Sequence, residues 1–201
     1  MKNTNVLTSK IIAGKYKGKN LELPSLEITR SSKSALKESF FNVLQFDIVD
    51  KTFIEAFAGS GCIGLEAISR GAKDVFFIEK DKKSYSVLLK NCKSIDISKC
   101  NTNRGDSFVL LPKIIDDLKN RTNDLIIYLD PPFDIREGMD DIYNNCFNIV
   151  SNIKNDNIYL ICFEHISSLK MPELLGSFSL QKSKKFGKST LSYYKYSFKK
   201  E

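Results

Sequence analysis

The sequence lacks the features of membrane-spanning, exported and histidine-rich metal proteins. No run among its 201 residues approaches the roughly 18 consecutive apolar residues of a membrane helix, so we expect no transmembrane span. Residues 1–15 contain no apolar stretch of secretory length, so we expect a cytoplasmic protein. The single histidine, His165, argues against most catalytic triads, and we expect this side chain to make structural hydrogen bonds.

Cysteine is also scarce, and its spacing argues against two further kinds of site. The five cysteines form no C-x-x-C pair, which favours reduced, buried thiols over a zinc site or a disulfide framework. We therefore expect no bound metal. With 42% hydrophobic residues the chain can bury one sizeable core, so we expect one main domain and a monomer.

The net charge of +7 is unevenly distributed along the chain. Residues 52–165 carry more acidic than basic side chains, whereas residues 1–51 and 166–201 are both basic. An acidic middle between basic ends suggests a small-molecule site in the centre and a polyanion bound from the sides. The alternative is a set of surface lysines that serves solubility, and charge alone leaves both readings open.

The N-terminal part of the chain has the pattern of a short β-hairpin followed by a helix. Residues 10–23 carry apolar pairs around two glycines, which is typical of two short strands and a turn. Residues 32–46 place apolar side chains on one helical stripe. We expect residues 1–30 to form an N-terminal β-hairpin extension and residues 31–201 to form the main domain.

From Thr52 onward, strand and helix patterns alternate. Five apolar strands are separated by helices, and the end of the chain holds two alternating runs about a Lys/Gly turn. This order predicts an α/β, Rossmann-like fold with a mostly parallel seven-stranded sheet and an antiparallel C-terminal edge. The expected strands lie at 52–57, 74–81, 102–104, 125–130, 157–164 and in the two halves of 178–198; the expected helices run from the glycine loop to Arg70 and over 82–94, 107–118 and 137–151.

Acidic side chains stand where four of these strands end. Ligands of open α/β sheets bind beyond the carboxyl ends of the strands. One acid at such a position can be an ordinary loop carboxylate, but four in succession predict a shared binding site at this edge. The four acids are Glu55, Glu79, Asp106 and Asp130.

The loop after the first of these strands, residues 58–64, reads AGSGCIG and has the spacing G-x-G-x-x-G. Its glycines permit a tight turn and a close approach of the backbone to a ligand. Enzymes of NAD, FAD and S-adenosylmethionine (SAM) all use variants of this motif, so the motif alone is a weak signal. The alternative is a loop that serves only strand–helix packing.

Two acids favour SAM as the ligand of this loop. Glu79 ends the second strand, where a carboxylate can bind both hydroxyls of a ribose. Glu55 lies just before the loop, where it would repel a pyrophosphate but attract the cationic amino group of the methionine moiety of SAM. We therefore predict SAM rather than NAD.

The strand at 125–130 runs into the sequence Asp-Pro-Pro-Phe. Pro131 and Pro132 fix the backbone and remove two donors, so the segment presents acceptors in a rigid frame. Phe133 offers a face for stacking a planar base, which contributes roughly 1–3 kcal/mol. Such a site suits an exocyclic amine on an aromatic heterocycle, which Asp130 would align and deprotonate. The alternative is a simple strand-ending turn.

These motifs, in this order, resemble the RsmD family of bacterial 16S rRNA (guanine-N2)-methyltransferases. Besides D-P-P-F, the matching segments are IIAGKYKGKNLELP, TRSSKSALKESFFNVL, EAFAGSGCIGLEAISRGAKDVFFIEKD, FEH and KFGKSTLSYY, which together extend over nearly the whole chain. The first helix departs from the usual T-R-P-T-x-D of the family, since Ser31 and Ser34 replace its proline and aspartate. Glu55 replaces the usual aspartate of the first strand and keeps its charge.

The resemblance implies a class I SAM-dependent methyltransferase domain at 31–201. Its substrate would be the N2 amine of a guanine in 16S rRNA, within a partly or fully assembled 30S subunit. The residues implied in methyl transfer are Asp130, Pro131, Pro132 and Phe133. The residues implied in SAM binding are Glu55, Phe57, Ala58, Gly59, Ser60, Gly61, Glu79, Asp106 and Ser107.

Basic residues near the two ends of the chain favour an RNA partner. Side chains that neutralise phosphates give binding that weakens steeply with salt. A solvated, lysine-rich surface is the alternative for any single lysine. The predicted RNA-binding residues are Lys15, Lys17, Lys19, Arg30, Lys184 and Lys185.

Three other functions stay open at this point. Methyltransferases of protein glutamine N5 pose the same chemical problem, but they generally carry N-P-P-Y and a larger helical N-terminal domain. A DNA adenine N6 methyltransferase would need a separate target-recognition domain, for which little sequence is left. The third possibility is a catalytically idle RNA-binding protein of the same fold.

Overall fold

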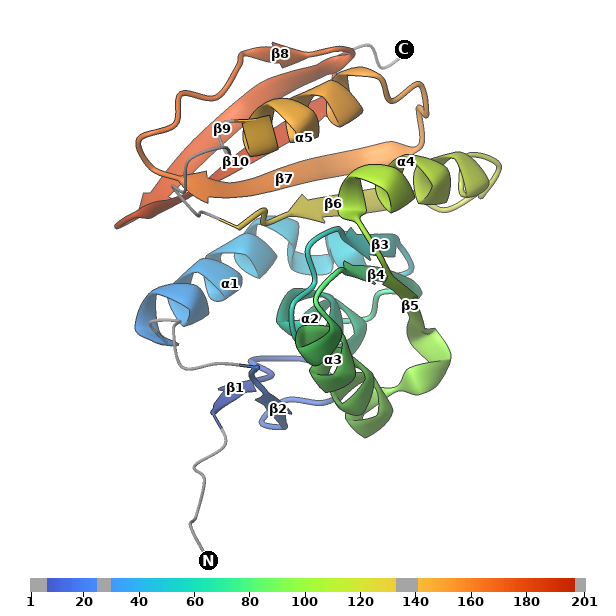
Figure 1. Cartoon of the computed structure of the whole chain (residues 1–201), viewed down its shortest axis with the longest axis vertical. Helices are drawn as coiled ribbons and strands as arrows, with labels where there is room; N and C mark the ends of the chain where they lie inside the picture. Colours follow the sequence, from blue (N-terminus) through green and yellow to red (C-terminus); the bar gives the residue numbers. More distant parts are fainter. Residues whose placement is uncertain (1–6, 25–29, 133–140, 198–201) are drawn as a thin grey trace, which may run out of the picture.

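An eight-stranded sheet runs through the described part of the chain, which comprises residues 7–24, 30–132 and 141–197 of a computed structural model (Figure 1). Its strands follow the order β5-β4-β3-β6-β7-β10-β9-β8. The strands from β5 to β7 are parallel, and β10 runs antiparallel to both β7 and β9. The bounds are β3 (Thr52–Glu55), β4 (Asp74–Glu79), β5 (Cys100–Arg104), β6 (Leu125–Leu129), β7 (Ile158–Ile166), β8 (Leu174–Leu175), β9 (Phe178–Phe186) and β10 (Ser189–Tyr196).

This architecture confirms the predicted α/β class, with a mostly parallel sheet and an antiparallel C-terminal edge. The sheet has eight strands rather than the expected seven, because the two-residue β8 pairs with β9 at the edge. Two residues are too few to show an alternating pattern, so no periodicity in the sequence marks this strand. The helix expected at 137–151 is α5 (Asp141–Ser151), and residues 133–140 lie outside the described residues.

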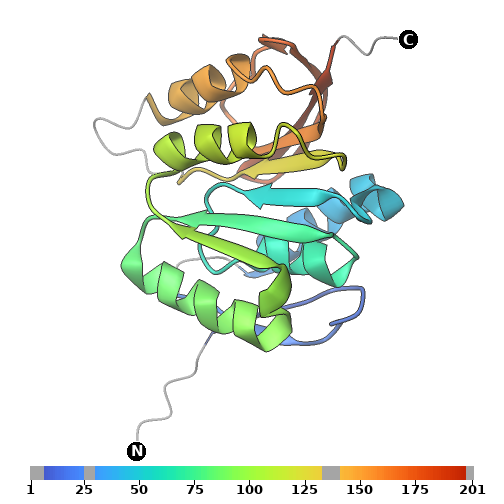
Figure 2. The same ribbon diagram turned by 90° about the vertical axis from the view of Figure 1, so that its right-hand side faces the viewer.

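Helices cover both faces of the sheet. The first face carries α1 (Arg30–Leu44), α2 (Cys62–Ser69) and α3 (Lys82–Ile95), while α4 (Ser107–Asp117) and α5 lie side by side on the second (Figure 2). Two short 3-10 turns, η1 (Gln45–Ile48) and η2 (Ile97–Lys99), follow α1 and α3. None of the described helices combines the length and the apolar character needed to cross a membrane.

The alternation of side chains along the strands explains these two layers. Successive residues of a strand point to opposite faces, and β3 and β6 are buried on both. Phe53 and Tyr128 join the core under α1, α2 and α3, whereas Ile54 and Leu129 join the core under α4 and α5. Each large apolar side chain buried in this way contributes about 1.5–3 kcal/mol.

A hairpin of β1 (Thr8–Lys10) and β2 (Asn20–Glu22) lies against α2 and α3 (Figure 1). The carboxylate of Glu66 in α2 is 0% exposed and accepts hydrogen bonds from Ile12 N (2.7 Å) and Ala13 N (3.0 Å). Arg70 Nε approaches the same carboxylate at 2.8 Å, which offsets the cost of burying its charge. The hairpin is therefore hydrogen-bonded to α2 through its backbone amides. That residues 1–30 form a separate N-terminal extension stays a prediction.

Replacing Gly14 with alanine should loosen the hairpin from α2. Gly14 has a φ of +82°, and a Cβ atom there would lie 1.8 Å from the backbone oxygen of Ser69. Gly18 is a matched control, since its φ is +87° and an added Cβ would meet nothing within 4 Å. Both substitutions incur left-handed strain of about 1–2 kcal/mol. Only Gly14→Ala adds a steric cost, of about 1–3 kcal/mol.

Urea unfolding of the two variants measures the difference. We expect Gly14→Ala to lower the free energy of unfolding clearly more than Gly18→Ala does. Equal losses in the two variants would contradict the close contact between the hairpin turn and α2.

Candidate functional site

Three carboxylates converge at the carboxyl ends of neighbouring parallel strands. Glu55 ends β3, Asp130 follows β6, and Glu164 lies near the end of β7. Glu55 pairs with Tyr128 of β6, and Leu129 pairs with Phe163 of β7. By alternation, all three acids face the same side of the sheet as Tyr128, toward α1.

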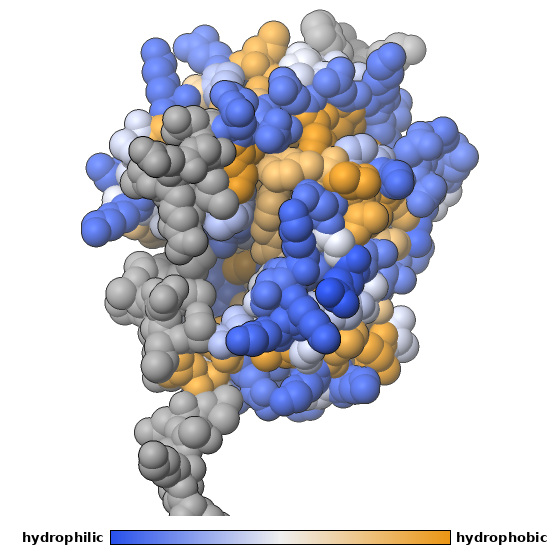
Figure 3. Space-filling view, in the orientation of Figure 1, coloured by the Kyte–Doolittle hydropathy of each residue, from blue (hydrophilic) through white to orange (hydrophobic). Residues whose placement is uncertain are grey.

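These carboxylates line one cavity of about 450 Å³. The glycine loop, the start of α1 and the outer ends of the hairpin strands form its other walls. Figure 3 shows hydrophilic side chains over much of one face of the molecule, with a shaded hollow near the middle. The lining residues are Thr8, Ser9, Lys10, Leu23, Pro24, Ser34, Leu36, Lys37, Glu55, Phe57, Ala58, Gly59, Ser60, Cys62, Ile63, Asp130 and Glu164.

Glu55 joins the first strand to the start of α2. Its carboxylate accepts from Gly64 N at 2.8 Å and Ile63 N at 3.4 Å, so part of the helix N-terminus is already satisfied by the protein. Burial raises the pKa of Glu55 to about 8, and the nearby charge of Asp130 adds to the rise. A Cβ atom on Gly64 would lie 2.4 Å from the ring of Phe77 and 2.9 Å from Glu55 Oε2, so only glycine permits this packing.

The remaining predicted cofactor residues form a rim behind the loop. Glu79 accepts hydrogen bonds from Gly59 N (2.6 Å) and Asp81 N (2.7 Å), and burial raises its pKa. Asp106 caps α4 through Phe108 N (2.9 Å) and pairs with Lys80. These two acids lie beside the cavity wall rather than in it.

Two more predicted residues complete this rim. The hydroxyl of Ser107 donates to the backbone oxygen of Ala56, which anchors α4 to the start of the loop. Gly61 is the N-cap of α2, with a left-handed φ of +78°. Five of the nine predicted cofactor residues therefore line the cavity, and the other four support its wall.

The first residue of the Asp-Pro-Pro segment reaches the cavity wall at the end of β6. Asp130 lines the cavity, Pro131 is buried and Pro132 is exposed. The predicted stacking residue, Phe133, lies outside the described residues. The structure therefore brings the predicted acid and the glycine loop to one cavity.

Glu164 is a site residue that the sequence reasoning did not single out. It is 1% exposed, and its Oε2 accepts a hydrogen bond from the hydroxyl of Tyr128 at 2.8 Å. A signal was present, because Glu164 follows the apolar run of its strand as the other acids follow theirs. The adjacent His165 bonds to Ser192 Oγ (2.8 Å) and the Ile166 oxygen (2.9 Å), and burial lowers its pKa. These bonds agree with the predicted structural role of His165.

The basic residues near the C-terminus lie at the same edge of the sheet as the cavity. Lys184 and Lys185 are exposed near the end of β9. The adjoining start of β10 pairs with Ile166, the last residue of β7. Lys184 Nζ also contacts Ser39 Oγ of α1 at 3.0 Å.

The hairpin lysines lie at the opposite edge. Lys15 N donates to the backbone oxygen of Ser69 (2.7 Å), and Lys19 Nζ donates to that of Ser94 (2.8 Å). Ser69 lies in the last turn of α2 and Ser94 in the last turn of α3. Lys17 is exposed between the two lysines. Arg30 is the first residue of α1, but its side chain lies outside the described part.

No group of three or more His, Cys, Asp or Glu side chains within 7–24, 30–132 and 141–197 is arranged to hold a metal ion. All five cysteines are free thiols, and three of them, Cys92, Cys146 and Cys162, are buried.

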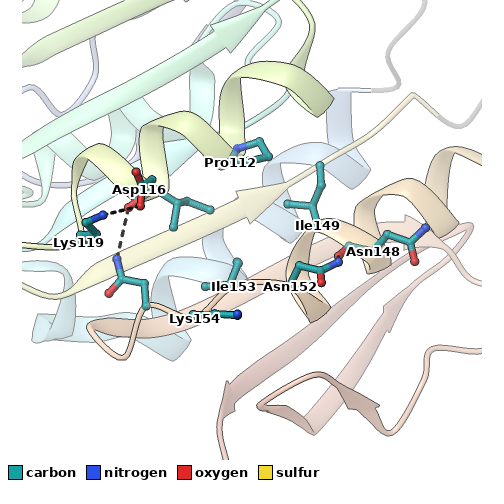
Figure 4. Close-up of a pocket in the computed structure, with 10 residues that line it drawn as sticks. Pro112, Asp116, Lys119, Asn148, Ile149, Asn152, Ile153 and Lys154 are labelled. Atoms are coloured by element: carbon teal, nitrogen blue, oxygen red, sulfur yellow. Dashed lines mark hydrogen bonds and ion pairs between the residues drawn. The ribbon is translucent and has the colours of Figure 1, made fainter.

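A larger hollow of about 600 Å³ lies elsewhere, between α4 and α5 (Figure 4). Pro112 and Asp116 of α4, Ile149 of α5 and Asn152 just after α5 lie along it. Its only carboxylate, Asp116, is paired with Lys119 at 2.9 Å, and no predicted site residue reaches it. Volume alone therefore does not single out a candidate site, and we take the cavity in which the acids converge as the candidate.

The sequence is similar to a described protein family and to named relatives. The model of the family described as "Conserved hypothetical protein 95" matches residues 9–195. Ribosomal RNA small subunit methyltransferase D of Haemophilus influenzae is 36% identical over 127 residues, which are 62% of this chain and 63% of that protein. The protein of the same name from Buchnera aphidicola subsp. Acyrthosiphon pisum is 30% identical over 166 residues, 81% of this chain and 82% of that one. The chain belongs to the RsmD family.

Solved structures with a similar fold include methyltransferases by name. A structure named "Putative methyltransferase yhhF from Escherichia coli" has a TM-score of 0.72 and 26% identity, over 96% of this chain and 100% of that one. The fold is that of class I methyltransferases, as predicted from the sequence.

Replacing Glu55 with glutamine should change how stability depends on pH. In the unfolded chain Glu55 ionises near its ordinary pKa of 4.5, whereas in the folded chain it keeps its proton up to about pH 8. Between these two pH values Glu55 is ionised in the unfolded chain but protonated in the folded chain. The free energy of unfolding of the wild type therefore falls as pH rises. A neutral glutamine does not titrate and removes this contribution.

Urea unfolding of wild type and Glu55→Gln at pH 5 and pH 8 measures the effect. Between pH 5 and pH 8 the free energy of unfolding should fall more in the wild type than in the variant. The difference should exceed about 1.4 kcal/mol, which is the equivalent of one pKa unit. Parallel pH curves for the two proteins would show that the folded state does not raise the pKa of Glu55.

Proposed function

We propose that this RsmD-family protein transfers a methyl group from SAM to the N2 amine of a guanine in 16S rRNA. The observation that carries the proposal is the shared cavity, which is lined both by the glycine loop with Glu55 and by the acid of the Asp-Pro-Pro segment. The relatives named as small-subunit rRNA methyltransferases support the class of reaction and of substrate.

The charges of the site fit SAM. Glu55 is a buried carboxylate on the cavity wall, and a cationic amino group beside it would favour its ionised form. Glu79 holds Gly59 of the loop at 2.6 Å and places a second carboxylate at the end of the next strand, where ribose hydroxyls would bind. A pyrophosphate beside Glu55 would instead favour its protonated form and gain no charge attraction from it, so the residues fit SAM better than a dinucleotide.

The protein contributes alignment and proton transfer. Bound SAM supplies the electrophilic methyl group, which moves to the amine nitrogen as its bond to sulfur breaks. The carboxylate of Asp130 accepts a hydrogen bond from an N–H of the amine, and this bond turns the nitrogen lone pair toward that methyl group. Asp130 then takes the proton that the nitrogen loses on methylation. The buried Pro131 keeps the acid in place by fixing the backbone after it.

The RNA would approach from the edge where the cavity opens. Lys184 and Lys185 lie at this edge, with Lys184 in contact with α1, and they would bind phosphates beside the modified base. We propose that the substrate is the rRNA of a partly or fully assembled 30S subunit. Lys15, Lys17 and Lys19 would then bind a second stretch of the same RNA beyond the far ends of α2 and α3.

Replacing Asp130 with alanine should nearly abolish transfer while SAM affinity stays largely intact. Loss of a general base and of substrate alignment predicts a fall in kcat of at least about 100-fold. Radiolabelled methyl transfer to 30S particles from a strain that lacks the gene measures turnover, and isothermal titration measures SAM binding.

Asp124→Ala is the matched control for this experiment. Asp124 lies at the opposite end of the same strand, where it pairs with Lys51 on the surface at 2.6 Å. Its removal should leave turnover within about twofold, since exposed ion pairs contribute little. Near-normal turnover in Asp130→Ala would remove Asp130 from the mechanism.

Removing Lys184 and Lys185 together should weaken RNA binding more than removing Lys15 and Lys17. Both double variants lose two charges, but only the first pair lies at the edge of the cavity. We expect Lys184→Ala/Lys185→Ala to reduce the slope of log affinity against log salt by about 1 per lysine. Filter binding of 16S rRNA at several salt concentrations measures both slopes, and a larger change for the hairpin pair would place the main RNA contact at the opposite edge.

A further inference from the structure

A third carboxylate lies in the cavity beside Asp130 and has no part in the transfer step described above. Glu164 is 1% exposed and lines the cavity together with Glu55 and Asp130. Leu129 of β6 pairs with Phe163 of β7. The next residues, Asp130 and Glu164, therefore lie next to each other at the ends of adjacent strands. Adjacent strands are about 5 Å apart, so both carboxylates can contact one planar ligand.

A hydrogen bond from the buried Tyr128 fixes the position of Glu164. The hydroxyl of Tyr128 donates to its Oε2 at 2.8 Å. The ring of Tyr128 is itself buried, with its centroid 4.9 Å from that of Phe40 and 6.5 Å from that of Phe53. A tyrosine held by two aromatic neighbours has little freedom, so the carboxylate bound to it keeps one orientation toward the cavity.

Two adjacent carboxylates require a ligand rich in N–H donors. An ionised carboxylate is an acceptor only, and each of its oxygens can accept more than one hydrogen bond, so Glu164 can accept from a ligand in addition to Tyr128. Guanine presents three N–H groups on neighbouring atoms, one at N1 and two at N2. Adenine presents two at N6 and a lone pair at N1, and a glutamine amide presents two in all. Of these three substrates, guanine matches the pair of acids best.

We infer that Glu164 selects guanine by accepting hydrogen bonds from N1–H and from one N2–H of the target base. This inference rests on the proposed function and assigns a specificity-determining residue to the same site. The second N2–H then points to Asp130, which receives the proton that the amine loses. A base with a lone pair at N1 would face the charge of Glu164 and be rejected.

A substituted base tests this assignment. 2-Aminopurine keeps the amine at C2 but has a lone pair at N1 in place of N1–H. The substrates are 30S particles assembled with 16S rRNA that carries guanine or 2-aminopurine at the position that the wild-type protein methylates. Wild type should prefer guanine by about 100-fold or more in kcat/KM, because a site built for an N–H rejects an analogue that lacks it.

Glu164→Gln should reverse part of this preference. The glutamine amide can donate to the lone pair at N1 of 2-aminopurine while its oxygen accepts from the amine. We expect kcat/KM for guanine to fall about 10- to 100-fold and kcat/KM for 2-aminopurine to rise. SAM affinity and the thermal unfolding midpoint should stay close to those of wild type.

Two further variants separate specificity from structure. Glu173→Gln removes a negative charge from an exposed position outside the cavity and should leave both substrates unaffected. Glu164→Asp keeps the charge but withdraws it, so activity on guanine should fall without any gain on 2-aminopurine. This variant also provides the test if Glu164→Gln fails to fold.

The outcomes distinguish this inference from the proposed function. Equal losses on both bases in Glu164→Gln, or no loss at all, would overturn the role of Glu164 in base selection. If Glu164→Gln fails to fold, a gain on 2-aminopurine or an unchanged rate on guanine in Glu164→Asp would overturn it as well. A wild-type protein that methylates no guanine in the particles would instead overturn the proposed function.

Discussion

The hydrogen bond from Gly64 N to the buried carboxylate of Glu55 is the contact on which the site depends. At 2.8 Å it connects the last residue of β3 to the first turn of α2, and the loop between them is fixed by this closure. The close packing of Gly64 against Phe77 leaves no room for a side chain. Because the acid is buried, its charge responds strongly to whatever enters the cavity. One residue thus shapes the loop and sets the electrostatics of the pocket.

Much of the fold followed from periodicity in the sequence. The continuous apolar runs of β3 and β6 indicated strands covered on both faces, and the acids after them predicted a shared site at one edge of the sheet. The two-residue β8 could not be predicted, since its pairing with β9 depends on tertiary contact rather than on a pattern. The membership of the RsmD family was also predictable, because the order of its motifs extends through most of the chain.

The candidate site was predicted less completely than the fold. Glu55, Gly59 and Asp130 line one cavity as expected. Glu164 was missed because its importance comes from the register between β6 and β7, which no single segment encodes. The wall formed by α1 and the hairpin was also missed, because Lys37 and Ser9 line the cavity from elements that precede the sheet in the chain and only the tertiary fold brings them there.

The placement of the lysines on the hairpin turn sets a minimum length for any RNA that reaches them and the cavity together. They lie near the last turns of α2 and α3, and α3 has fourteen residues and a length of about 21 Å. A stacked strand rises about 3.4 Å per nucleotide, so a segment of about six stacked nucleotides would reach from the cavity to these lysines. An RNA that contacted both places would therefore be bound through its backbone well beyond the target base.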